Sequence, residues 1–269
     1  MRLPVWARHW TSIPIRNIPL RVRRGPNRGR KWSLAVSGRG VVAGRYEVER
    51  FQAVASLVRP EDVFWDIGAH YGYATLIAAR LVGPRGSVIS LEPSSSNRWY
   101  LRRHLRWNGE EGVRVLACAV AESDGTDVFG GTGGSVSFHL GHEGERVEVR
   151  SVSSLVESGL PFPTFLKIDV EGAEALVLEG ARAALSEQGG RDELPTMLVS
   201  VHDERLYRSC LDFMKGLDYT VLGSRRILDF KGEGQEWEGD PDLLAVPPHR
   251  RSELSVMQTI PWFATGPAL

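Results

Sequence analysis

The sequence has little cysteine and no long apolar run. Two of its 269 residues are cysteines, Cys118 and Cys210, and they form neither a CxxC pair nor a metal-ligand spacing. No stretch reaches the roughly 18 to 20 apolar residues of a membrane span, and residues 1–30 lack the apolar run of a secretory signal. We therefore expect a cytoplasmic protein with two buried, reduced thiols and no membrane span.

Acidic residues are missing from the beginning of the chain. Residues 1–45 hold 11 Lys and Arg and no Asp or Glu, whereas the whole chain is balanced at 33 basic and 33 acidic residues. The remainder therefore has 22 basic against 33 acidic residues. A basic segment can contact nucleic acid, an anionic lipid surface or an acidic substrate. We favour a solvated lead segment (residues 1–45, with a β hairpin over Trp32–Val42) that folds over an acidic domain (residues 46–269).

Apolar strands and amphipathic helices alternate along that domain. The predicted strands are Val63–Ile67, Val88–Leu91, Val113–Val120, Thr164–Ile168 and Thr196–Val201. The predicted helices are Tyr46–Val58, Tyr73–Val82, Asn97–Asn108, Ala173–Leu185 and Glu204–Gly216. Short apolar strands separated by helices indicate a parallel sheet covered on both faces, hence an α/β fold without a second domain. Two strands near Tyr219–Leu222 and Leu243–Val246 would close the sheet, and the Gly-rich stretch 125–152 predicts a hairpin insertion.

The sharpest motif is VFWDIGAHYGYAT, in which a strand ends at Asp66 and turns through Gly68 and Gly72 into a helix. Glycines at such a turn let a cofactor approach the backbone more closely than a Cβ permits. A dinucleotide enzyme carries glycine at the first position, where backbone donors cradle a pyrophosphate. Asp66 would repel a pyrophosphate, but it suits the ammonium and sulfonium charges of S-adenosylmethionine.

Glu92 supplies the second half of this predicted cofactor site. It ends the next strand in VISLEPSSSN, 24 residues after Gly68. A carboxylate at a neighbouring strand end can accept two hydrogen bonds from ribose hydroxyls. Ala119 and Val120 end the following strand and could seat an adenine between apolar side chains.

Ionisable residues end the next two strands. FLKIDVEGAE brings Lys167, Asp169 and Glu171 to the carboxyl edge of the sheet, where open α/β folds bind ligands. MLVSVHDERL brings His202 and Asp203 to the same edge. A Lys167–Asp169 ion pair and an Asp203 helix N-cap are the structural alternatives. For Glu174, in the first turn of a helix, compensation of the helix dipole is the favoured role.

Transfer of a methyl group to an alcohol needs a base that takes the proton, or a metal that lowers the pKa of the hydroxyl. We favour His202 as the base, oriented by Asp169, with a pKa near the ordinary imidazole value of about 6.5. The alternative is a Mg²⁺ site formed by Asp169, His202 and Asp203. It is less favoured because histidine suits Mg²⁺ poorly.

Taken together, these motifs resemble the FkbM family of methyltransferases. The resemblance covers about Tyr46 to Val246 and rests on GRYE at Gly44–Glu47, DIGAHYG, LEPSSSN, ACAVAESDG and LKIDVEGAE. It implies a Rossmann-like class I methyltransferase fold with a seven-stranded, mostly parallel sheet whose final strand is antiparallel. It also implies S-adenosylmethionine as donor and a hydroxyl acceptor on a sugar, polyketide or similar secondary metabolite.

The resemblance, combined with the strand-end analysis, assigns two sets of residues. The cofactor set comprises Glu47, Asp66, Gly68, Ala69, Gly72, Glu92, Pro93, Asn97, Ala119 and Val120. The catalytic set comprises Lys167, Asp169, Glu171 and His202. Two other classes of function stay open. A nicotinamide-dependent oxidoreductase would share the βαβ unit, although Asp66 argues against it. A non-catalytic, nucleic-acid-binding methyltransferase-like module is suggested by the basic arm with Trp6, Trp10 and Trp32.

Overall fold

A seven-stranded sheet forms the centre of the protein. The structure, a computed structural model, describes residues 18–36, 38–129, 144–187, 193–224 and 242–263. The strand order is β11-β12-β10-β9-β3-β4-β5. The strands are β3 (Val63–Ile67), β4 (Ser87–Leu91), β5 (Arg114–Leu116), β9 (Phe165–Ile168), β10 (Thr196–Ser200), β11 (Thr220–Gly223) and β12 (Asp242–Val246). The final strand, β12, runs antiparallel to both of its neighbours, β10 and β11, and the other pairs of the sheet are parallel, which confirms the predicted class I methyltransferase sheet.

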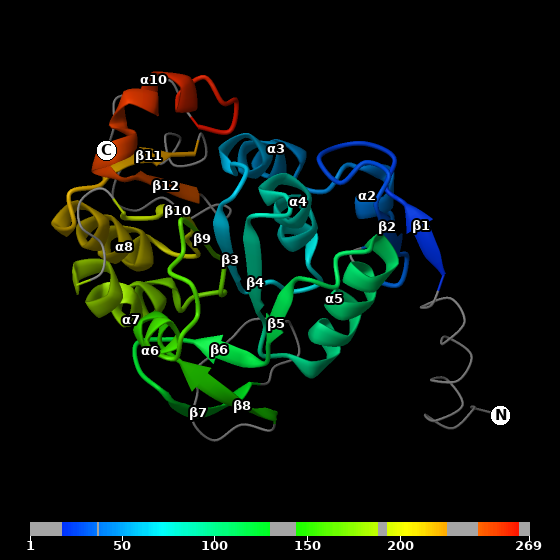
Figure 1. The fold of residues 1–269 in the computed structure, drawn as a ribbon, viewed down its shortest axis with the longest axis horizontal. Helices are drawn as coiled ribbons and strands as arrows, with labels where there is room; N and C mark the ends of the chain where they lie inside the picture. Colours follow the sequence, from blue (N-terminus) through cyan, green and yellow to red (C-terminus); the bar gives the residue numbers. More distant parts are fainter. Residues whose placement is uncertain (1–17, 37, 130–143, 188–192, 225–241, 264–269) are drawn as a thin grey trace.

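Helices cover both faces of this sheet (Figure 1). One face carries α3 (Val48–Leu57), α4 (Tyr73–Val82) and α5 (Ser95–Asn108), and the other carries α6 (Val152–Glu157), α7 (Glu174–Glu187) and α8 (Glu204–Gly216). Alternate strand residues enter opposite cores, as the two-residue period of a strand requires. On β3, Phe64 packs with the α3–α5 side and Trp65 with the α6–α8 side, and both are fully buried. A 3-10 helix η1 (Pro248–Glu253) and α10 (Leu254–Met257) follow β12.

The lead segment forms a hairpin, but not where the sequence predicted it. β1 (Pro19–Arg21) pairs antiparallel with β2 (Lys31–Ser33), and a short helix α2 (Gly38–Ala43) follows. The predicted hairpin over Trp32–Val42 is therefore wrong. The Gly-Pro-Asn turn lies between β1 and β2 instead, and its Asn27 side chain is buried and donates to the Tyr73 carbonyl at 2.8 Å. This described part of the segment packs against the domain.

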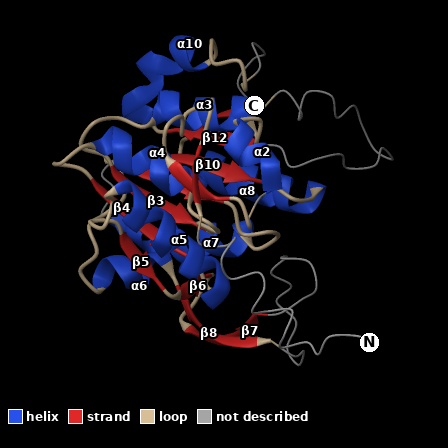
Figure 2. Cartoon of the chain, turned by 90° about the vertical axis from the view of Figure 1, so that its right-hand side faces the viewer, coloured by secondary structure: helices blue, strands red, loops and turns tan. Residues whose placement is uncertain are grey.

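The predicted strand Val113–Val120 is in fact two strands in different sheets. After β5, the chain leaves the edge of the central sheet and forms β6 (Cys118–Val120), which pairs parallel with β8 (Glu145–Arg150). β8 in turn pairs antiparallel with β7 (Gly125–Phe129), as the predicted hairpin insertion requires (Figure 2). Residues 130–143, with the glycine-rich stretch, lie outside the described residues.

Two further expectations from composition can be compared with the structure. Cys118 and Cys210 are both buried and unpaired, as predicted. Within the described part of the chain, no helix combines the length and the apolar character needed to span a bilayer.

We expect Gly180→Ala to destabilise the protein, although alanine normally favours a helix interior. A Cβ at Gly180 of α7 would lie 2.1 Å from the Ala121 carbonyl oxygen, and overpacking of this kind costs about 1 to 3 kcal/mol. A Cβ at Gly216, at the end of α8, would meet no atom within 4 Å. Gly216→Ala should therefore raise the free energy of unfolding by up to about 1 kcal/mol. Denaturant unfolding of both variants measures the contrast, and equal effects at the two positions would contradict this packing.

Candidate active site

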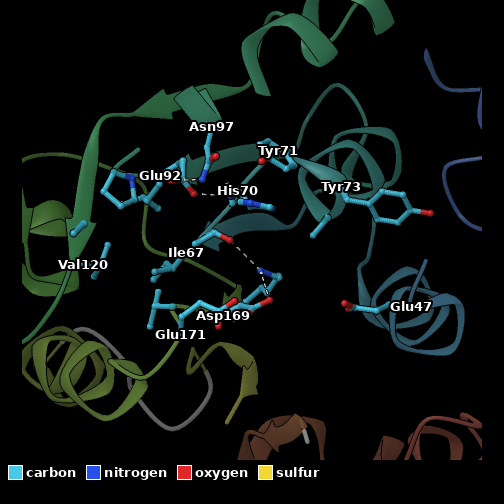
Figure 3. Close-up of a pocket in the computed structure, with 18 of the residues that line it drawn as sticks. Glu47, Ile67, His70, Tyr71, Tyr73, Glu92, Asn97, Val120, Asp169 and Glu171 are labelled. Carbon is cyan, nitrogen blue, oxygen red and sulfur yellow. Dashed lines mark hydrogen bonds and ion pairs between the residues drawn. The ribbon is translucent and has the colours of Figure 1, made fainter. Parts of the chain in front are cut away.

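A cleft opens at the carboxyl ends of β3, β4, β9 and β10 (Figure 3). All four predicted catalytic residues line it, together with eight of the ten predicted cofactor residues. The lining residues from the two predictions are Glu47, Gly68, Ala69, Glu92, Pro93, Asn97, Ala119, Val120, Lys167, Asp169, Glu171 and His202. The topology therefore gathers in one place residues that are as far as 155 positions apart in the sequence (47 to 202).

Glu92 is fixed in one wall of the cleft. Its buried carboxylate accepts hydrogen bonds from His70 N–H (2.7 Å), Ser94 N–H (2.9 Å) and the Asn97 side-chain amide (3.2 Å). Burial raises the pKa of Glu92, and the hydrogen bonds from Ser94 and His70 partly offset this rise. Apolar residues continue the same wall: Ile67, Leu91, Pro93, Ala119 and Val120.

The two glycines of the motif are required by the protein's own packing. Both have positive φ, at 76° for Gly68 and 86° for Gly72. A Cβ at Gly68 would lie 1.8 Å from the Asp169 carbonyl oxygen, and one at Gly72 would lie 2.2 Å from Leu101 Cδ1. Gly72 does not line the cleft. Contacts with Asp169 and Leu101 are thus a further reason for these glycines, and close approach of a cofactor at Gly68, which lines the cleft, stays a prediction.

Asp66 lies beneath the cleft and does not line it. It is fully buried, accepts a hydrogen bond from Thr75 Oγ1 at 2.6 Å, and lies 3.1 Å from Lys167 Nζ. Asp66 and Lys167 are direct neighbours across β3 and β9, which explains the pairing. Lys167 thus already matches the charge of Asp66, and the expected contact of Asp66 with a cationic cofactor stays a prediction.

Asp169 occupies the floor of the cleft between two cations. Its Oδ2 lies 2.9 Å from Arg50 Nη2 and 3.5 Å from Lys167 Nζ, so the predicted Lys167–Asp169 pair is present. Burial alone would raise the pKa of Asp169, but Arg50, Lys167 and His202 hold it well below its usual range. The Asp169 carboxylate is therefore ionised at neutral pH.

Arg50 is a central residue that the sequence analysis missed. It is buried, hydrogen-bonds Ser200, and forms ion pairs with Glu47 (2.8 Å) and Asp242 (3.2 Å) in addition to Asp169. Burial opposes its charge, but Asp242, Asp169 and Glu47 raise the pKa of Arg50 well above its usual value. The sequence feature that could have identified Arg50 is its position next to the apolar face of helix α3.

His202 is surrounded by carboxylates. Its Nδ1 lies 2.8 Å from Oε1 of the fully buried Glu174, and its Nε2 lies 3.4 Å from Glu171 and 3.9 Å from Asp169. Burial would lower the pKa of His202, but Glu174, Asp169 and Glu171 together raise it to about 9. The expected ordinary pKa of about 6.5 is therefore wrong. Glu174 does lie in the first turn of α7, as expected for compensation of the helix dipole, and it has a second role because it orients His202 and accepts from the backbone N–H groups of Val170 and Gly172.

The predicted metal ligands are not brought together as expected. Asp203 caps helix α8 by accepting from Leu206 N–H at 2.7 Å, so the N-cap alternative is confirmed. Ligand atoms of Asp169, Glu171 and His202 do lie within 4.8 Å of one another. Arg50 and Lys167 already neutralise Asp169, however, and a metal cation there would meet their repulsion.

Aromatic side chains form the wall opposite Glu92, and the sequence analysis assigned none of them to the site. Tyr73 lies at their centre, with ring centroids 4.5 Å from Phe51, 5.5 Å from Tyr46 and 5.6 Å from Trp32. Figure 3 shows Tyr73 and Glu47 across the cleft from Glu92 and Asn97. The available signal was the density of aromatic residues around GRYE and DIGAHYGYA.

Several solved structures match most of this chain. A methyltransferase FkbM from Methylobacillus flagellatus KT is 23% identical over 71% of this chain and 45% of its own, with a TM-score of 0.47. An S-adenosylmethionine-dependent O-methyltransferase from Thermotoga maritima is 12% identical over 75% and 65%, with a TM-score of 0.45. A fibrillarin from Aeropyrum pernix with bound S-adenosyl-L-methionine is 13% identical over 72% and 74%, with a TM-score of 0.44.

The chain thus spans 45% of the length of the M. flagellatus protein. The comparison with curated proteins found no match. The sequence model of the methyltransferase FkbM domain matches residues 66–221, more than half of the chain. This range carries the Glu92 wall and the strand ends of Asp169 and His202, and the chain belongs to the FkbM family of methyltransferases.

Proposed function

We propose that this protein transfers the methyl group of S-adenosylmethionine to a hydroxyl group of a sugar, polyketide or similar metabolite. The observation that carries the proposal is the division of the cleft. Glu92 and an apolar surface form one wall, aromatic rings form the opposite wall, and Asp169 and His202 lie between them.

The Glu92 wall fits the nucleoside part of S-adenosylmethionine. The Glu92 carboxylate is held by three donors of the protein, and its Oε2, which accepts from His70 N–H alone, keeps a site for a ribose hydroxyl. Ala119 and Val120 offer an apolar seat for adenine. Glu47, whose side chain is 38% exposed, is placed to meet an ammonium group.

The aromatic wall suits the acceptor. Tyr46 is partly exposed in this wall and can offer a flat apolar face to a sugar or polyketide, with the buried rings of Tyr73 and Phe51 packed against it. S-adenosylmethionine supplies an electrophilic methyl group when bound. The remaining task of the protein is to hold the acceptor oxygen in line, and such positioning can contribute roughly 7 to 11 kcal/mol of barrier reduction.

His202 is the group placed to take the proton of the acceptor. With a pKa of about 9, its neutral form is a minority at neutral pH, but that form is a stronger base than an ordinary imidazole. Glu174 fixes the ring through Nδ1, which leaves Nε2 directed toward Glu171 and Asp169 in the cleft. A metal-free reaction is proposed, with Arg50 and Lys167 matching the charge of Asp169.

A transfer screen tests the proposed reaction directly. Protein and methyl-labelled S-adenosylmethionine are incubated with pools of hydroxylated sugars, polyketides and, for comparison, RNA. Label is expected on an ether oxygen of a small molecule, with the rate unchanged by a chelator. Label found only on nitrogen, carbon or RNA would contradict the proposed acceptor class.

Replacement of Glu92 by glutamine should weaken cofactor binding. The amide keeps the shape of the side chain but turns a donor toward N–H groups and ribose hydroxyls that need an acceptor. We expect a loss of about 2 to 4 kcal/mol, which is at least about thirtyfold in Kd by calorimetry. The control is Glu122→Gln, which makes the same change at an exposed glutamate after the next strand end. An unchanged Kd in Glu92→Gln would remove the ribose assignment.

The imidazole of His202 should titrate near pH 9, well above an ordinary histidine. NMR of the ring nitrogens measures this in the free protein, and His202→Ala identifies the signal. Glu174→Gln should move the pKa downward toward 6.5, whereas Glu204→Gln, which removes a carboxylate paired with Arg208, should not. Since the folded pKa is raised, the stability that His202 contributes is complete below about pH 6.5 and is lost as the pH rises through about 9.

Turnover provides the second readout for His202. His202→Ala should lower methyl transfer by about 10² to 10⁴ while cofactor affinity stays within a few fold. In the wild type, the rate should rise with pH and level near 9. A rate that levels near 6.5, or full activity in His202→Ala, would rule His202 out as the base.

A further inference from the structure

The hairpin β1–β2 and helix α5 are adjacent basic segments, which together we name the hairpin–α5 surface (residues 18–33 and 95–108). The first range holds six Lys and Arg, the second holds four, and neither contains Asp or Glu. The two parts are joined because Asn108 accepts from Lys31 N–H at 2.8 Å and donates to its carbonyl at 2.9 Å. Figure 1 shows them side by side at one end of the molecule.

Most cations of this surface are not neutralised by the protein. Arg30 pairs with Glu110 at 2.6 Å, and Arg98 lies 3.8 Å from Glu145. No described acidic side chain forms an ion pair with the exposed arginines of the surface, which are Arg21, Arg23, Arg24, Arg28, Arg102 and Arg106. Like charges gathered in this way attract an extended anionic partner.

Exposed apolar side chains lie on the same surface. Three large apolar side chains are strongly exposed in the described residues, and two of them are Ile18 (52%) and Trp99 (47%). The third, Val256, belongs to α10. Tryptophan and aliphatic side chains among arginines are typical of a protein face that lies in a membrane interface.

Several observations favour a lipid surface over a nucleic acid. The Arg103 guanidinium lies over the Trp99 ring at 4.9 Å and over the Trp107 ring at 5.0 Å, so a stacked base would compete with it for these rings. An aliphatic side chain such as Ile18 offers a nucleotide no stacking surface. The preceding sequence, residues 1–17, continues the same composition, with Trp6, Trp10, Ile13 and Ile15 among three arginines and without an acidic residue.

We propose that the hairpin–α5 surface docks this protein on an anionic lipid bilayer. The exposed arginines contact lipid phosphates, and Ile18 and Trp99 enter the boundary between head groups and acyl chains. Charge and apolar contact act together, as stable peripheral binding requires. Trp32 of β2 and Asn97 of α5 both line the cleft, so the elements that carry the docking surface also contribute residues to the active site.

Vesicle sedimentation of the full chain tests this proposal. Vesicles of equal parts phosphatidylglycerol and phosphatidylcholine should bind the protein, vesicles of phosphatidylcholine alone should not, and added salt should release it. Reversal of three charges in Arg23→Glu, Arg28→Glu and Arg106→Glu should weaken binding at least about tenfold. The matched control reverses three exposed charges elsewhere, with Arg80→Glu, Arg205→Glu and Lys215→Glu, and should keep binding within about twofold if the effect is local to the surface.

Two further measurements sharpen the outcome. Trp99→Ala should weaken vesicle binding by a few fold without changing its salt dependence, and circular dichroism should show that all variants are folded. Equal losses of vesicle binding in the two triple variants would overturn the surface assignment. Full vesicle binding by the Arg23→Glu, Arg28→Glu and Arg106→Glu variant would overturn it as well. A gel shift with single-stranded RNA, tighter than vesicle binding at the same salt and abolished by the first triple variant, would overturn the proposal in favour of a nucleic-acid partner.

Discussion

The pairing of Asp169 with two buried cations is the interaction on which the cleft depends. Arg50 reaches Asp169 from helix α3, and Lys167 reaches it from the same strand. Arg50 also binds Asp242 and Lys167 also binds Asp66, so the charges of β3, β9, β12 and α3 form one network. Removal of one member would leave an uncompensated buried charge, which typically costs about 3 to 5 kcal/mol. The floor of the cleft is therefore set by the fold before any ligand binds.

Much of the fold could be predicted from the sequence because its pattern is local. An apolar strand followed by an amphipathic helix shows in any short window, and the sheet order follows once the motifs at the strand ends are recognised. The hairpin β1–β2 and the break between β5 and β6 could not be predicted in this way. Both depend on pairing with distant segments, with Asn108 for the hairpin and with β8 for β6.

The sequence predicted which residues meet at the candidate site, but not their charge states. Strand ends identify which residues meet at a sheet edge, so Glu92, Asp169 and His202 could be placed. Their charge states depend on neighbours that no motif marks. Arg50 lies on a helix before the first motif, and Glu174 acts on His202 only because α7 begins beside β10. The ordinary pKa assumed for His202 was wrong for this reason.

The two walls of the cleft come largely from different parts of the chain. Family membership therefore describes one wall better than the other. The Glu92 wall and the catalytic edge lie within residues 66–221, the range that matches the family. Trp32, Tyr46 and Phe51 of the aromatic wall all precede that range, as does Arg50. The range that matches the family therefore covers the Glu92 wall and the catalytic edge, but it leaves out Glu47 and much of the acceptor wall. Because Trp32 lies on β2, the packing of the hairpin against α5 shapes that wall, and changes in the lead segment should alter acceptor choice before they alter cofactor binding.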